Sequence, residues 1–212
     1  MKEKGLMLKL HNLGFTLNGI VEVILVTRGA DGSMNAAPMG VMLVEDFLEL
    51  RPYKSSQTYM NLRLGGEAAI NICNDPYFFL ATAFKEEVPH QPQVCSDMSL
   101  LDADSCIYVN VQGETSLSET QAVFKAKPIK LIIKRKHTIV FSRGRAEAIE
   151  AVIHTTRVKA LQQQRKISEV RTLTEKIAQC AEIVWRVSPE GSSENRTISE
   201  LYRIMADWGV QA

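Results

Sequence analysis

The chain has 212 residues and a formal net charge of +1, with 45% hydrophobic and 23% charged residues. These values are typical of a globular protein with one sizeable core, or with a core domain and a helical appendage. A nearly neutral chain offers no global electrostatic reason to bind nucleic acid or a membrane surface. The longest apolar runs are far shorter than the ~20 residues of a membrane helix. Because the N-terminal stretch also lacks the apolar core of a secretory signal, we expect reduced cysteines and a cytoplasmic protein.

A β-hairpin is the first predicted feature. Residues 20–28 form an apolar, β-rich run that meets Ala30-Asp31-Gly32-Ser33, a turn signal because glycine tolerates positive φ and aspartate bonds its own backbone. The returning strand, residues 35–44, carries small residues and Pro38 where bulky side chains are typical. Small residues in a strand indicate close approach by a ligand or another backbone. We expect Pro38, which lacks an N–H donor, to interrupt or bulge the pairing.

A polar segment follows the third predicted strand, residues 47–53. The sequence Arg51-Pro52-Tyr53-Lys54-Ser55-Ser56-Gln57-Thr58 gathers two cations and several hydroxyls, which suit a phosphate group. A helix predicted over residues 55–64 would begin here and direct its free N–H groups at the anion. The residues therefore favour a flat ligand on strand 35–44, with its phosphate at residues 51–58.

The remaining periodicity separates strands from helices. We predict strands at residues 68–73, 106–111 and 122–133, a short helix at 77–84, and an irregular surface segment at 86–104. Beyond Ser142 the apolar period becomes helical, and Asn195 or Thr197 is expected to cap the last helix. The predicted buried faces are Ile149/Val152/Ile153/Thr156, Val170/Leu173/Ile177/Ala181/Val184 and Ile198/Leu201/Tyr202/Met205. Strands followed by helices in separate blocks predict an α+β protein with a first domain at 1–140 and a helical region at 141–212.

Three of these segments also carry a family resemblance. Asp31-Gly32-x-x-Asn35-Ala36-Ala37-Pro38-Met39-Gly40-Val41, the Arg/Ser/Thr-rich segment, and Glu67-Ala68-Ala69-Ile70-Asn71-Ile72 resemble FMN-binding split-barrel proteins. Within that superfamily the chain is most similar to a prokaryotic family of flavin-reductase-like proteins. The resemblance implies a six-stranded split β-barrel, non-covalent FMN, and flavin-dependent oxidoreduction with a reduced nicotinamide as hydride donor. It also implies a homodimer with the flavin near the subunit interface.

The candidate cofactor site combines the hairpin and the polar segment. Flavin chemistry needs a phosphate cradle, a flat slot, and donors aimed at the pyrimidine edge of the ring. No catalytic acid or base is visible, and the four histidines and four cysteines lack the spacing of a metal site. The candidate cofactor-binding residues are Thr27, Arg28, Asn35, Ala36, Ala37, Pro38, Met39, Gly40, Arg51, Lys54, Ser55, Ser56, Thr58 and Asn61.

Other readings of the sequence stay open. A run of eight cations without an intervening acid, from Lys125 to Arg145, is either a solvated surface or a site for a polyanion. It would suit the anionic tail of a deazaflavin coenzyme, and a non-catalytic flavin-binding protein is a further alternative. Nucleic-acid binding is the least favoured, because aromatic residues suited to base stacking are nearly absent there. The family resemblance also includes residues 145–154 with Thr156 and Arg157, a segment to which we can assign no chemistry.

Overall fold

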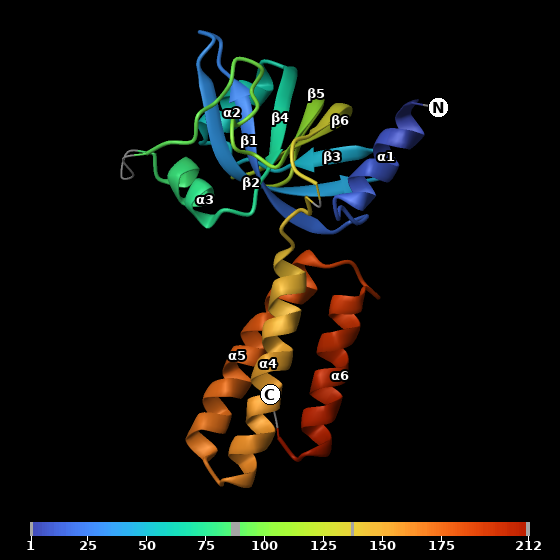
Figure 1. Cartoon of the computed structure of the whole chain (residues 1–212), viewed down its shortest axis with the longest axis vertical. Helices are drawn as coiled ribbons and strands as arrows, with labels where there is room; N and C mark the ends of the chain where they lie inside the picture. Colours follow the sequence, from blue (N-terminus) through green and yellow to red (C-terminus); the bar gives the residue numbers. More distant parts are fainter. Residues whose placement is uncertain (1, 86–89, 137, 211–212) are drawn as a thin grey trace. The chain divides into compact units, whose positions relative to one another are not determined.

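The computed structural model describes residues 2–85, 90–136 and 138–210 (Figure 1). The chain divides into two compact units, Met1–Phe141 and Ser142–Ala212. The first unit contains all six strands, and the second contains three long helices.

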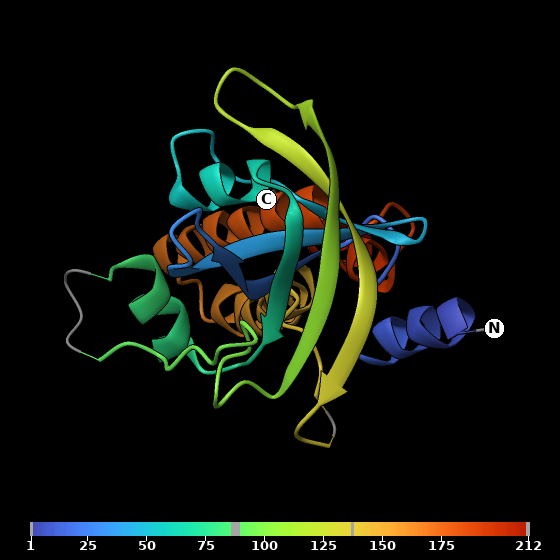
Figure 2. The same ribbon diagram turned by 90° about the horizontal axis from the view of Figure 1, so that it is seen from above.

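The first unit is a closed antiparallel barrel. Its strands are β1 (Ile20–Arg28), β2 (Met34–Val44), β3 (Phe47–Leu50), β4 (Gly66–Ile72), β5 (Ser105–Ser116) and β6 (Ala122–Ile133). They pair in the order β1-β2-β3-β6-β5-β4, and β4 closes the barrel on β1. Figure 2 shows β5 and β6 as a long twisted pair. The barrel, followed by helices, confirms the predicted α+β class with a split barrel of the FMN-binding type.

Three helices accompany the barrel. These are α1 (Lys2–Asn12), α2 (Gln57–Arg63) and α3 (Pro76–Ala83), of which α1 was not predicted. Polar residues interrupt the apolar positions of α1, so its sequence has little amphipathic signal. The helix is nevertheless anchored, because Leu10 and the following Leu13 and Phe15 are buried in the barrel core.

Strand β1 is buried on both of its faces. Val21, Val23 and Leu25 point into the barrel core, while Ile24 and Val26 belong to a second apolar cluster. That second cluster also contains side chains from α3 and from the segment that precedes β5: Phe78, Phe79, Val94, Met98, Leu100 and Ala103. A strand covered on both sides explains why its sequence is apolar almost throughout, without the alternation of a half-exposed strand.

The segment before β5 is held on the barrel by a buried asparagine. Residues 86–89 of the predicted irregular segment lie outside the described residues, and the rest contains a single bridge, Val94 with Leu100. The amide nitrogen of Asn71 donates to the carbonyls of Ala69 (3.3 Å) and Met98 (3.2 Å). Its oxygen accepts the N–H of Leu100 at 2.8 Å. Asn71 has no solvent exposure, so this one buried side chain ties the backbone of the segment before β5 to strand β4.

The expectation that Pro38 interrupts or bulges the pairing was wrong. The pairing of β1 with β2 runs without a register shift from Ile20↔Met42 to Arg28↔Met34 and includes Ile24↔Pro38. On its other edge β2 pairs with β3 along residues 41–44 alone. A proline whose nitrogen faces that unpaired edge removes no ladder hydrogen bond, so the strand can continue through it.

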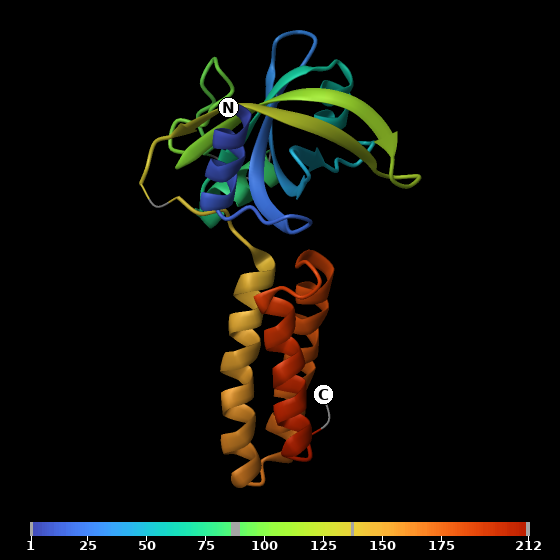
Figure 3. The same ribbon diagram turned by 90° about the vertical axis from the view of Figure 1, so that its right-hand side faces the viewer.

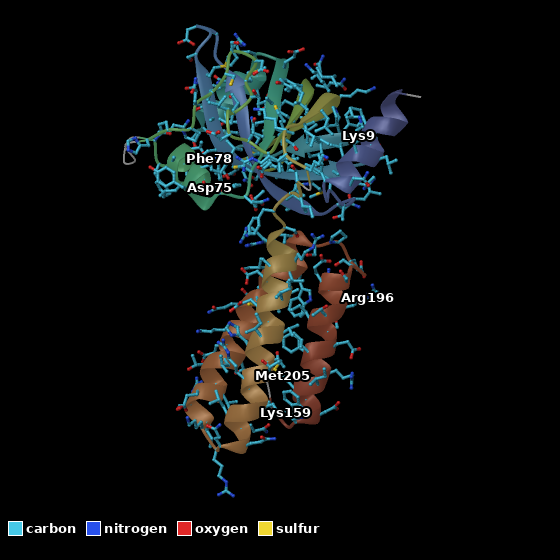
Figure 4. All side chains as sticks on the ribbon, in the orientation of Figure 1. Lys9, Asp75, Phe78, Lys159, Arg196 and Met205 are labelled. Carbon is cyan, nitrogen blue, oxygen red and sulfur yellow. The ribbon has the colours of Figure 1, made fainter. Side chains whose placement is uncertain are left out.

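The second unit is a bundle of α4 (Arg143–Gln163), α5 (Ile167–Val187) and α6 (Ser193–Asp207), which run alongside one another in Figure 3. The predicted faces of α5 and α6 are confirmed: Leu173, Ile177, Ala181, Val184, Ile198, Leu201 and Met205 are buried, and Met205 is labelled in Figure 4. The predicted cap of α6 was wrong, because Ser192 accepts the N–H of Asn195 and the helix begins earlier.

The predicted buried face of α4 was also wrong. The helix buries Ala148, Ala151, Thr155 and Val158 in the bundle, while Ile149 is 57% exposed and Val152 and Ile153 are 38% exposed. Small alanines allow α4 to pack closely on its neighbours. Because both sides of α4 carry apolar residues, periodicity alone could not identify the inner one.

Removing the Asn71 side chain should destabilise the barrel. Asn71→Ala removes the side-chain partner of the Leu100 N–H and of the Met98 carbonyl. Each buried polar group left unpaired costs about 1–3 kcal/mol, so we expect a loss of roughly 3 kcal/mol in the free energy of unfolding. Urea unfolding monitored by circular dichroism measures this loss. The matched control is Asn110→Ala on the exposed part of β5, which should change stability by less than about 0.5 kcal/mol. Equal effects of the two variants would contradict the role of Asn71.

Candidate functional site

The predicted hairpin turn forms as expected. The carboxylate of Asp31 accepts the N–H of Ser33 at 2.9 Å and the Ser33 hydroxyl at 2.6 Å, and Gly32 adopts a φ of +83°. These contacts lower the pKa of Asp31, the Ser33 hydroxyl having the largest effect. The turn sets the register in which Thr27 lies opposite Asn35 and Arg28 opposite Met34. Two of the predicted site residues, Thr27 and Asn35, are therefore neighbours at one end of the barrel.

Helix α2 joins this end of the barrel through two side-chain hydrogen bonds. The amide of Asn61 donates to the hydroxyl of Thr27 at 3.0 Å, and the amide of Asn35 donates to the hydroxyl of Thr58 at 3.0 Å. Thr27, Thr58 and Asn61 are nearly completely buried, at 2–4% exposure. The structure thus gathers four predicted residues from three elements; we call Thr27, Asn35, Thr58 and Asn61 the mouth network.

Two residues that the sequence did not indicate contact the mouth network. Gln57 donates its amide to the Asn61 oxygen at 2.8 Å, and the ammonium of Lys85 donates to the Asn35 oxygen. Burial of this ammonium lowers the pKa of Lys85. Lys85 follows α3 and reaches Asn35 across a sequence separation of 50 residues, so no local motif could have revealed it.

The small residues of β2 lie close to protein atoms. Ala36 is buried in the second apolar cluster, beside Phe78 and Phe79 of α3, and Met39 points into the barrel core. A side chain at Gly40 would meet the Ile20 methyl at 3.2 Å and the Glu22 carboxylate at 3.7 Å. Packing therefore explains part of the small-residue pattern, while Ala37 and Pro38 stay partly exposed.

Arg51 lies toward the other end of β2. Its Nη2 donates to the carboxylate of Glu49 at 2.8 Å and contacts the sulfur of Met42 at 3.6 Å. Met42 is seven residues from Asn35, or roughly 24 Å along a strand that rises about 3.4 Å per residue. The Arg51 Nε is buried without a hydrogen-bond partner among the described residues. The structure thus separates Arg51 from the mouth network.

The side chains of Lys54, Ser55 and Ser56 do not converge on one point. The Lys54 ammonium donates to the Ser118 carbonyl at 2.8 Å and contacts the Ser116 hydroxyl at 3.1 Å, near the β5–β6 turn. Ser56 caps α2 by accepting the Tyr59 N–H at 3.2 Å, so the helix begins two residues later than the predicted residue 55. Its hydroxyl also donates to the Tyr53 carbonyl at 2.7 Å, whereas Ser55 is exposed. The role of these residues toward a phosphate stays a prediction.

An open groove of about 530 Å³ lies beside the hairpin. It is lined by Arg28, Gly29, Ala30, Leu64, Gly65, Glu67 and Met98. Arg28 donates its Nη2 to the Ser96 carbonyl at 3.0 Å and so links the end of β1 to the segment before β5. Among the predicted site residues, Arg28 alone lines this groove.

An aspartate next to the groove has a strongly perturbed acidity. The Tyr108 hydroxyl donates to Asp97 at 2.6 Å and the Ser99 hydroxyl donates at 2.8 Å. These bonds, that of Tyr108 first, lower the pKa of Asp97 to about 2. Burial, reinforced by the bond to Asp97, raises the pKa of Tyr108 above its usual range. The pair fixes the loop that carries Met98.

The cations between Lys125 and Arg145 do not act as one surface. Lys125 lies 5.9 Å from the ring centre of Phe47, and Lys130 lies 5.2 Å from that of Tyr108. Lys134 donates to the carbonyls of Leu100 and Leu101, at 2.7 and 3.2 Å. The remaining charged pairs include Arg135 with Asp104 and, in the helical unit, Arg145 with Glu194. These separate contacts explain much of the run structurally.

Two further findings concern metal ions and membrane helices. No three or more of their histidine, cysteine, aspartate or glutamate side chains are grouped so as to hold a metal ion. None of the helices within residues 2–85, 90–136 and 138–210 has the length and apolarity that crossing a bilayer requires.

The barrel and its mouth place the chain in the class of split barrels of the FMN-binding type. Residues 21–135, just over half of the chain, match the model of the N-terminal domain of DUF447, a protein family of unknown function. The chain therefore belongs to the DUF447 family. No curated protein sequence matches it significantly.

Several solved structures resemble this chain at low sequence identity. An FMN-bound DUF447 protein from Methanosarcina mazei is 21% identical with a TM-score of 0.51, over 92% of this chain and 98% of that one. The flavin reductase of styrene monooxygenase from Pseudomonas putida S12 is 11% identical with a TM-score of 0.47, over 56% and 81% of the two chains. The flavin reductase PheA2 is 12% identical with a TM-score of 0.46, over 60% and 86%.

The Asp97–Tyr108 bond predicts a specific acid sensitivity. Because the pKa of Asp97 is about 2 in the folded protein and near 3.9 in an unfolded chain, its contribution is complete above about pH 4. The contribution disappears as the pH falls toward 2. Tyr108→Phe removes the main cause, so it should raise the pKa of Asp97 and destabilise the protein more at pH 6 than at pH 2.5. Carboxyl NMR titration and urea unfolding at the two pH values test this. An unchanged pKa of Asp97 in the variant would refute the assignment.

Proposed function

We propose that this chain binds one FMN non-covalently and acts as a flavin-dependent oxidoreductase of the flavin-reductase type. The observation that carries the proposal is the mouth network. It joins Asn35, at the start of the small-residue segment of β2, to Thr58 of the predicted phosphate segment, and it joins Thr27 of β1 to Asn61 of α2. Two stretches that the sequence suggested separately are therefore linked at one end of the barrel.

The family supports the same proposal. A DUF447 protein with this fold over nearly all of both chains has a structure with bound FMN. Extending FMN binding from the Methanosarcina protein to this chain is part of the proposal.

The residues present fit a flavin in part. Asn35, the partly exposed member of the mouth network, would contact the ring from a position fixed by the buried Thr58, and Ala37 and Pro38 would leave room for a flat ligand. The Lys85 ammonium, which contacts the Asn35 oxygen, would supply a positive charge to a flavin bound beside Asn35. The buried Nε of Arg51 has an unused donor, whereas Lys54 and Ser56 would have to exchange present contacts for a phosphate. When bound, FMN supplies the electron-transfer chemistry.

We further propose a reduced nicotinamide as electron donor and a homodimer with the flavin near its interface. Both follow from the resemblance to split-barrel flavoproteins. The four cysteines Cys73, Cys95, Cys106 and Cys180 are free thiols, which fits the reducing environment of the cytoplasm.

The alternatives differ in which observation supports them. A deazaflavin coenzyme was suggested by the basic run, and the separate contacts of Lys125, Lys130 and Lys134 weaken that argument. The same contacts weaken nucleic-acid binding. A protein that binds flavin without turnover keeps the whole site, and kinetics separates it from a reductase.

The cofactor and its turnover are tested together. The purified protein should carry or take up FMN at one per chain, and anaerobic NADH or NADPH should bleach the flavin absorbance far faster than it bleaches free FMN. Bleaching by dithionite alone would favour a binding protein, and reduction by a reduced deazaflavin alone would favour that coenzyme. A colourless protein that fails to quench FMN fluorescence at micromolar concentrations would contradict the proposal.

Arg51 is the predicted phosphate contact that a variant tests most directly. A charge-assisted hydrogen bond contributes roughly 1.5–3 kcal/mol, so Arg51→Ala should weaken FMN binding about 10- to 100-fold. Riboflavin, which lacks the phosphate, should bind equally to both proteins. Lys54→Ala should act in the same direction but more mildly.

The controls separate binding from folding. Arg63→Ala removes an exposed arginine of α2 that pairs with Glu114 at 3.5 Å, and FMN affinity should not change. If Arg51→Ala acts by releasing Glu49, riboflavin binding and the thermal transition fall together with FMN binding. Unchanged FMN affinity in Arg51→Ala, with a loss in Lys125→Ala/Lys127→Ala, would place the phosphate elsewhere on the barrel.

A further inference from the structure

Two opposite charges line the groove beside the hairpin. They belong to Arg28 and Glu67. The pairing of β1 with β4 includes Val26↔Ala69 and, continued by two residues along each strand, sets Arg28 opposite Glu67. Val26 and Ala69 belong to the second apolar cluster, and side chains two residues apart on a strand share a face. The two charged side chains therefore lie next to one another on the outer face of β1 and β4.

The two charges do not neutralise each other. Arg28 donates one N–H to the Ser96 carbonyl at 3.0 Å, which places the guanidinium at the groove and leaves most of its donors for a ligand. Within residues 2–85, 90–136 and 138–210, the Glu67 carboxylate has no ion pair and no hydrogen bond. Opposite charges on neighbouring strands stabilise a sheet when they pair. Here they instead flank an open groove of about 530 Å³.

An apolar wall lies beside the two charges. Leu64, at the end of α2, is 58% exposed and lines the groove together with Met98. The backbone of Met98 is fixed, because its N–H donates to the Cys95 carbonyl at 2.9 Å and its carbonyl accepts the Asn71 amide at 3.2 Å. Its φ of +67° is rare for a residue with a long side chain. The surrounding contacts thus hold Met98 in this conformation at the groove.

We infer that the groove binds a small zwitterion with an apolar body, the chemical class of the apolar α-amino acids. Its carboxylate binds the Arg28 guanidinium, because an arginine fork forms two parallel hydrogen bonds with a carboxylate. Its ammonium binds Glu67, and its apolar body covers Leu64 and Met98. Glu67 disfavours a ligand that is only anionic, and Arg28 disfavours one that is only cationic. The groove also has the size of small-molecule sites, roughly 300–1,000 Å³.

The groove adjoins the mouth network. Arg28 directly follows Thr27, and a Cβ at Gly29 would lie 3.6 Å from the Asn61 oxygen. A zwitterion in the groove therefore lies next to the proposed flavin position. The inference gives Arg28, which the sequence assigned to the cofactor, a different ligand, and it does not depend on FMN binding.

NMR titration of the full-length protein tests the inference. L-phenylalanine is the probe, and the amide signals of Gly29 and Gly65, which line the groove, report binding. Two analogues are matched controls: 3-phenylpropionate lacks the ammonium, and phenethylamine lacks the carboxylate. Each lost charge-assisted contact weakens binding about tenfold, so phenylalanine should bind about tenfold more tightly than either analogue. A saturating concentration of FMN should leave this titration unchanged.

Two variants connect each charge of the ligand to its residue. Arg28→Gln should weaken the binding of phenylalanine and 3-phenylpropionate about tenfold and leave that of phenethylamine unchanged. Glu67→Gln should weaken the binding of phenylalanine and phenethylamine and leave that of 3-phenylpropionate unchanged. Arg63→Gln replaces an exposed arginine of α2 outside the groove lining and should change none of the three affinities.

The amide signals outside the groove confirm that each variant is folded, and the comparison of analogues needs no variant. No response of Gly29 and Gly65 to phenylalanine up to about 10 mM, or equal affinities for the three probes, would overturn the inference. Displacement of phenylalanine by FMN would assign the groove to the flavin and would also overturn it. A protein that binds phenylalanine with this selectivity but does not bind FMN would support the inference and contradict the function proposed above.

Discussion

The attachment of α2 to the mouth of the barrel is the constraint on which the candidate site depends. Two side-chain hydrogen bonds, Asn61 to Thr27 and Asn35 to Thr58, join the helix to the β1–β2 hairpin. Because Thr27, Thr58 and Asn61 are buried, breaking either bond would leave polar groups unpaired away from water, which is costly. The bonds therefore fix the helix relative to the strands and hold polar atoms beside the small residues of β2.

The barrel itself supports this arrangement from the far side of β1. The inner face of β1 fills the barrel, and its outer face is covered by α3 and by the segment around Met98. Asn71 anchors that segment by its amide, and Asp97 with Tyr108 fixes the loop at its edge. Lys85 then reaches Asn35 from the end of α3. The mouth thus receives side chains from elements distant in the sequence, as ligand sites on rigid scaffolds commonly do.

The sequence predicted the parts of this protein that depend on local patterns. The hairpin turn at Asp31 and Gly32 and the strand at residues 122–133 are local features, and the structure confirms them. Features that depend on distant partners were missed: α1 is held by Leu10 in the barrel core, and Lys85 contacts Asn35 fifty residues away. The alternation of side chains along the third predicted strand also could not show that Glu49 binds Arg51 and holds it away from Thr58. On α4 the bulkiest residues indicated the wrong face, because the alanines make the bundle contacts.

We propose that FMN binds at the mouth network, and a crystal structure of the protein soaked with FMN would locate the flavin. We expect ring density against residues 35–40 of β2, with polar contacts from the Thr58–Asn61 side of α2 and from Lys85. Density at the cations of β6, or a fully loaded protein whose mouth network is free of ligand, would contradict it.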